Sequence, residues 1–159
     1  MAIYDLAVKK QGPLSFFAIA TLSDASLAMC RSGRLADGIA NSRKAFDASS
    51  KVFGPRARLT GGVASTLATC LVDVGQFDET AKLHDNIDIS TVTQLAGDPD
   101  WGAGVKLQQA KIAFARVNYE VTRNLLREVA PVFTRPNSEV YSQREYKTLP
   151  ARLDWVANR

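Results

Sequence analysis

A cysteine and a histidine are the residues of this chain best suited to covalent chemistry. The chain has one histidine, His84, and two cysteines, Cys30 and Cys70. A histidine beside a cysteine activates a thiolate nucleophile, and His84 could meet Cys70 across one pair of helices. Such a nucleophile also needs an orienting group and an oxyanion site. We therefore interpret His84 as a partly buried structural residue, and we expect no catalytic residues and no enzyme.

Metal binding and acid–base catalysis have less support. One histidine and two cysteines cannot assemble a Cys/His metal site, so we expect no metal and no cofactor. Asp85 and Asp88 lie three residues apart on one expected helix face, and such a carboxylate pair serves acid–base catalysis only in apolar surroundings. We interpret this pair as solvated surface.

Basic residues gather in the first part of the chain. They surround a Gly-Pro turn and the helices before it: Arg31, Arg34, Arg43, Lys44, Lys51, Arg56 and Arg58. Such a group can bind phosphate, which makes a nucleic-acid-associated regulatory module the alternative function. The net charge is only +4, and Asp37, Asp47 and Asp73 lie close enough to neutralise the basic group. We do not expect nucleic acid to be the partner.

A repeat of 42 residues is the main organising feature of the sequence. Three turn segments recur at this spacing: Gly33-Arg34-Leu35, Gly75-Gln76-Phe77 and Val117-Asn118-Tyr119. Small residues recur seven positions before each turn, at Ser26, Ala68 and Ala110, and five after it, at Gly38, Thr80 and Thr122. Small residues allow two helix backbones to approach closely. A fixed period of this length predicts stacked helix pairs.

The same period reaches the beginning of the chain and sets the expected elements. Residues 3–13 align with residues 45–55, so residues 1–11 read as the tail of a helix that Gly12-Pro13 ends. Further helices are expected at about 14–32, 35–52, 59–74, 77–95, 101–116, 119–129 and 139–146. Asp100 is expected to cap one of them, Pro131 and Pro136 to bound a loop, and Pro150 to kink or divide the tail.

The cysteines do not follow this period. Cys30 and Cys70 are 40 residues apart rather than 42, so we expect them on different faces of equivalent helices and expect no disulfide. Both should behave as small apolar residues, with Cys30 the more exposed of the two. Trp101 and Trp155 are expected to pack as large apolar residues.

The sequence resembles the tetratricopeptide repeat family, in the 42-residue form found in kinesin light chains. The resemblance rests on Gly33-Arg34-Leu35-Ala36-Asp37-Gly38-Ile39-Ala40, Phe53-Gly54-Pro55, Gly75-Gln76-Phe77-Asp78-Glu79-Thr80 and Gly97-Asp98-Pro99-Asp100, and it covers about residues 3–130. The sequence departs from the family where Val117 replaces the turn glycine, and where Thr80 and Thr122 replace alanine.

The resemblance implies an all-α, right-handed solenoid of antiparallel helix pairs in a single domain. It would hold about three full repeats (about 14–55, 56–99 and 100–135), a partial unit at 1–13 and a C-terminal capping helix at 138–158. The chain would be a non-catalytic scaffold and part of a larger regulatory or signalling protein. A peptide or protein segment would bind in a concave groove lined by the first helix of each pair: Leu27, Arg31, Thr69, Val72, Asp73, Leu107, Lys111 and Phe114.

Composition agrees with an ordinary globular protein. Of the 159 residues, 46% are hydrophobic and 23% charged, and no apolar run approaches the roughly 20 residues that cross a bilayer. Leu14–Leu22 lacks the basic start and the cleavage pattern of a signal peptide. We therefore expect no membrane association, and a cytoplasmic location.

Overall fold

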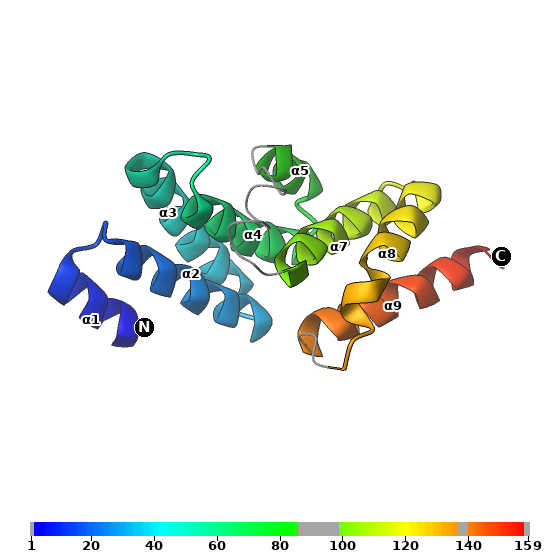
Figure 1. Ribbon diagram of the computed structural model, residues 1–159, viewed down its shortest axis with the longest axis horizontal. Coiled ribbons are helices and arrows are strands. Elements are labelled where there is room, and N and C mark those ends of the chain that lie inside the picture. Colours follow the sequence, from blue (N-terminus) through cyan, green and yellow to red (C-terminus); the bar gives the residue numbers. More distant parts are fainter. Residues whose placement is uncertain (1, 86–98, 137–139, 158–159) are drawn as a thin grey trace. The chain divides into compact units, whose positions relative to one another are not determined.

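The regular secondary structure of the described residues is all helical. The computed structural model describes residues 2–85, 99–136 and 140–157, which contain no β-strand. The helices are α1 (Ala2–Gln11), α2 (Phe16–Arg31), α3 (Leu35–Phe53), α4 (Arg58–Asp73), α5 (Phe77–Asp85), α7 (Pro99–Ala115), α8 (Tyr119–Phe133) and α9 (Val140–Ala157) (Figure 1). This confirms the expected all-α class for these residues.

Most helix bounds match the sequence prediction within two residues, and two expectations, on Asp100 and on Pro131, were wrong. Asp100 lies inside α7, which already begins at Pro99, so it is not the cap. Helix α8 continues through Pro131 to Phe133, so Pro131 does not bound a loop. Helix α9 continues through Pro150, which therefore does not divide the tail, and a kink at Pro150 stays a prediction. In both helices buried apolar residues lie close to the proline, and their burial outweighs the lost backbone hydrogen bond. The predicted helix at 77–95 is seen as α5 up to Asp85, and its remainder lies outside the described residues.

The 42-residue period is present in the backbone as well as in the sequence. Gly33, Gly75 and Val117 all have positive φ angles, of 85°, 77° and 61°. The amide that follows each of them donates to the carbonyl five residues back, at 2.9 Å in all three turns: Arg34 to Met29, Gln76 to Leu71 and Asn118 to Ala113. This is the Schellman pattern that ends a helix on a left-handed residue. The turn positions inferred from the sequence are therefore confirmed.

The chain forms two compact units, Met1–Asp88 and Ile89–Arg159. In the first, α3 packs against both α2 and α4, α2 also packs against α4, and α4 packs against α5. Its core includes Ile19 and Leu22 of α2, Ala45 of α3 and Val63 of α4, with Leu59 among the side chains packed against this cluster. Neighbouring helices therefore share one continuous apolar interior.

The second unit is built on α7, α8 and α9. Its core joins residues of all three helices: Ala103, Leu107, Ala110, Leu126, Val129, Phe133, Leu149 and Leu153. Phe133 also contacts Tyr146, with ring centroids 5.8 Å apart. On the same helix as Leu149 and Leu153, Trp155 is 59% exposed, which differs from the packed position expected for it.

Candidate interaction face

Cys30 and Cys70 form a disulfide between α2 and α4, and the expectation of no disulfide was wrong. Their Cα atoms are 5.7 Å apart. Both cysteines are buried, and Cys30, at 4% exposed, is only marginally more exposed than Cys70, at 0%. Helices α2 and α4 are equivalent helices of successive repeats, and each contacts the other through a different face. Cysteines on different faces of equivalent helices are therefore the ones that can meet, and the offset of two residues was the missed signal.

A second link joins the same two helices nearer their beginnings. The Ser23 hydroxyl of α2 donates a hydrogen bond of 3.1 Å to the Thr66 hydroxyl of α4. Ser23 is seven residues, or two helical turns, before Cys30, so the two links hold α2 against α4 over that length. The side chains along this helix pair therefore have a fixed spacing.

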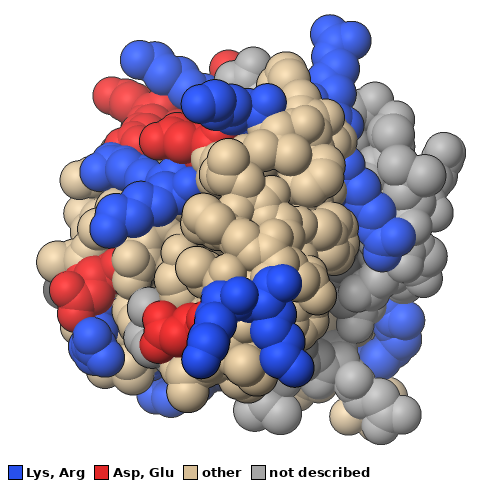
Figure 2. Space-filling view, turned by 90° about the vertical axis from the view of Figure 1, so that its left-hand side faces the viewer, with Lys and Arg blue, Asp and Glu red and all other residues tan. Residues whose placement is uncertain are grey.

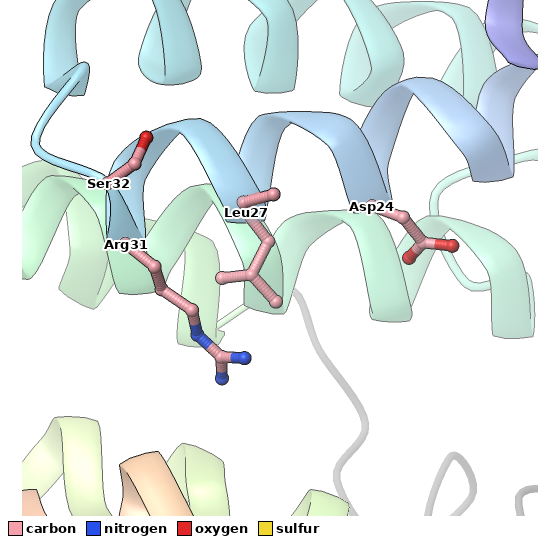
Figure 3. A pocket seen from close by; sticks show the side chains of 5 residues that line it. Asp24, Leu27, Arg31 and Ser32 are labelled. Atoms are coloured by element: carbon pink, nitrogen blue, oxygen red, sulfur yellow. The ribbon is translucent and has the colours of Figure 1, made fainter.

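Two of the predicted groove residues border one pocket beside α2. The pocket is lined by Asp24, Leu27, Ala28, Arg31 and Ser32. Leu27 is half-buried and Arg31 exposed. Figure 3 shows that Asp24, Leu27 and Arg31 project from the same side of the helix. One apolar side chain between an acidic and a basic group can anchor a peptide and orient it.

The predicted groove residues of α4 occupy positions equivalent to those of α2. Thr69 and Asp73 lie 42 residues after Leu27 and Arg31. Thr69 is half-buried, and its hydroxyl donates to the Ser65 carbonyl at 3.0 Å. Asp73 is exposed, whereas Val72 is 5% exposed and offers little surface. We define the α2–α4 face by Asp24, Leu27, Arg31, Thr69 and Asp73.

The remaining predicted groove residues lie on α7 in the second unit. Leu107 belongs to the core of that unit and is 2% exposed, so its surface is already used in packing. Phe114 is half-buried against Tyr119, with ring centroids 5.7 Å apart. Lys111 is half-buried. Lys111 and Phe114 therefore retain surface for a partner, and Leu107 retains almost none.

His84 is 7% exposed, which agrees with the structural role expected for it. The alternative that it activates Cys70 is excluded in the oxidised protein, because the Cys70 sulfur is bonded to Cys30. Among the residues that the structure describes, no three His, Cys, Asp or Glu side chains are placed to hold a metal ion.

The basic residues of the first unit are interleaved with acids. Arg34 lies 2.8 Å from Asp37, and Arg43 lies 2.6 Å from Glu79, measured between guanidinium nitrogen and carboxylate oxygen. Figure 2 shows Lys and Arg beside Asp and Glu around an uncharged area. Ion pairs of this kind reduce the positive potential available to a phosphate backbone. Two of the seven basic residues named above are therefore paired with acids.

Comparison of the chain with models of protein families, with curated proteins and with solved structures gives no match. Within the described residues, no helix combines the length and the apolar character that a membrane span requires.

Proposed function

We propose that this chain is a non-catalytic protein-interaction scaffold of the tetratricopeptide type, a right-handed stack of helix pairs whose first helices line a groove. The observation that carries the proposal is the α2–α4 face. It presents one apolar side chain, Leu27, between charged groups, on two helices joined by a disulfide and a hydrogen bond. A face held in place before binding loses little entropy when a partner docks.

The character of this face suits a peptide or a protein segment better than a polyanion. Asp24 and Arg31 lie one on each side of Leu27 in the pocket, and Asp73 occupies on α4 the position that Arg31 occupies on α2. The mixture of signs favours a partner with an apolar anchor flanked by polar groups of both charges. In the second unit, Lys111 and Phe114 of α7 hold the register positions proposed for binding, and both keep part of their surface exposed.

Charge reversal tests this proposal. The full chain carrying Arg31→Glu and Lys111→Glu is compared with wild type in capture of partners from a lysate of the source organism. The matched control carries Lys44→Glu and Arg123→Glu, two exposed cations on the second helices of their pairs. We expect the groove variant to lose a specifically captured protein by about tenfold, with the control unchanged. Equal capture by both variants, at unchanged helicity, would contradict the groove assignment.

A further inference from the structure

Helix α1 carries an exposed apolar stripe outside the α2–α4 face. Ile3 is 65% exposed and Leu6 is 52% exposed, one turn apart on the same side of α1. Phe17, at the start of α2, is 49% exposed. Large apolar side chains grouped on one surface mark interaction sites more often than scattered single ones do.

The 42-residue period shows what covers the equivalent stripe on α3. Ile3, Leu6 and Phe17 correspond to Ala45, Ala48 and Leu59. All three of these belong to the first unit's core or pack against it, and Ala45 is 0% exposed. Helix α3 lies between α2 and α4, whereas α1 packs against α2 alone among the described helices. One repeat later, the position equivalent to the α1 stripe lies on α3, and α2 covers it there.

The direction of a covering helix follows from the same comparison. Phe16 at the beginning of α2 contacts Phe53 at the end of α3, with ring centroids 6.2 Å apart. A helix in the same place on α1 would begin near the end of α1, where Lys9 and Lys10 are exposed. Acidic residues in the first turn of that helix would pair with these lysines and also suit its own dipole.

The size of the residues on α1 defines the rest of the partner. Ile19 and Leu22 of α2 pack with Ala45, a small residue. Ile3 and Leu6 are larger than the alanines they correspond to, so a covering helix needs smaller residues opposite them to keep the packed volume similar. We propose that the Ile3–Leu6 stripe of α1 binds an amphipathic helix of a partner protein, antiparallel to α1, with an acidic first turn and small apolar residues.

A labelled peptide tests the proposal with the full chain. The probe is residues 14–32 of this protein carrying Phe16→Glu, Phe17→Glu, Ile19→Ala and Cys30→Ser, and binding is followed by fluorescence anisotropy. The protein variant Ile3→Ser with Leu6→Ser alters only exposed side chains, and Val121→Ser, on α8, is the matched control. A second probe has lysine at positions 16 and 17.

We expect saturable binding that Ile3→Ser with Leu6→Ser weakens by at least about tenfold and Val121→Ser leaves unchanged. The lysine probe should bind several-fold more weakly. Equal affinity of wild type and the stripe variant would overturn the proposal, as would no saturation up to about 1 mM peptide. Sedimentation of the wild type and of both variants, without peptide, tests for a third outcome. A dimer that only the stripe variant loses would show that a second copy covers the stripe, which also overturns the proposal.

Discussion

Cys30 and Cys70 covalently connect α2 to α4, although the two residues fall at different positions of the 42-residue repeat. The bond joins residues 40 positions apart and connects the two helices that carry the face proposed to bind a partner. In the oxidised chain, this bond fixes the two helices relative to each other.

The oxidation state of these cysteines is the first prediction. The air-oxidised, denatured protein should contain no titratable thiol, and reduction should lower the free energy of unfolding by roughly 2–4 kcal/mol in urea titrations. The variant Cys30→Ala with Cys70→Ala should be insensitive to reductant. Two reactive thiols in the oxidised protein would refute the bond. Disulfides are rare in the reducing cytosol, so the thiol content of protein taken directly from cells also tests the expected cytoplasmic location.

A side chain at Gly38 is predicted to destabilise the close contact between α2 and α3. A Cβ at this position would lie 3.0 Å from the Ser26 carbonyl oxygen and closer still to the Cys30 sulfur. Gly38→Ala should therefore lower the free energy of unfolding by about 1–3 kcal/mol.

Gly62 supplies the control for Gly38. It lies inside α4, and no neighbouring atom comes within 4 Å of a Cβ added there. Gly62→Ala should raise stability by about 0.5–1 kcal/mol, because alanine restricts the unfolded chain. Thermal unfolding measures the stability of both variants. A stability change of the same sign at the two positions would show that the close approach of α2 and α3 at Gly38 is wrong.

Val117 is predicted to be strained in its turn. It holds a φ of 61°, which is unfavourable for a β-branched residue, and it is 67% exposed. Val117→Gly should stabilise the protein by about 1 kcal/mol, since it relieves the strain and loses little buried surface. Val74→Gly is the matched control because Val74 is exposed beside a turn but has a φ of −103°. If both variants are destabilised in calorimetry, the strain is not there.

The ion pair between Arg43 of α3 and Glu79 of α5 is predicted to contribute little. Its side chains are 47% and 41% exposed, so water screens the attraction. A double-mutant cycle with alanine at both positions should give a coupling energy of about 1 kcal/mol or less, and 0.5 M salt should reduce it further. A coupling above about 2 kcal/mol would mean that this pair holds the two helices together.

Local features of the fold were readable from the sequence, whereas contacts between helices were not. Gly33 and Gly75 marked helix ends because a left-handed residue is needed there, and the period located Val117 in the same role. Pro131 misled the prediction, because local proline rules ignore the buried side chains that allow α8 to continue past it. The disulfide was missed because it depends on which faces of α2 and α4 meet.

For the candidate site too, the sequence could indicate some features and not others. Leu27 and Arg31 both border the pocket beside α2, since a helix register decides which side chains share a face. Leu107 shares that register, yet it is buried in the core of the second unit. Register alone cannot distinguish a face turned to solvent from one covered by a later helix, such as α9.

Deleting one repeat tests the central claim that each helix pair is a unit stabilised by its neighbours. The variant lacks residues 33–74, joins Ser32 to Gly75, and carries Cys30→Val because Val72 occupies the equivalent position. The helical circular dichroism signal per molecule should fall by about a quarter, as 42 of the 159 residues are removed. The remaining chain should still unfold cooperatively. Loss of half the signal or more would mean that the first unit collapses without this segment, and would contradict the repeat account.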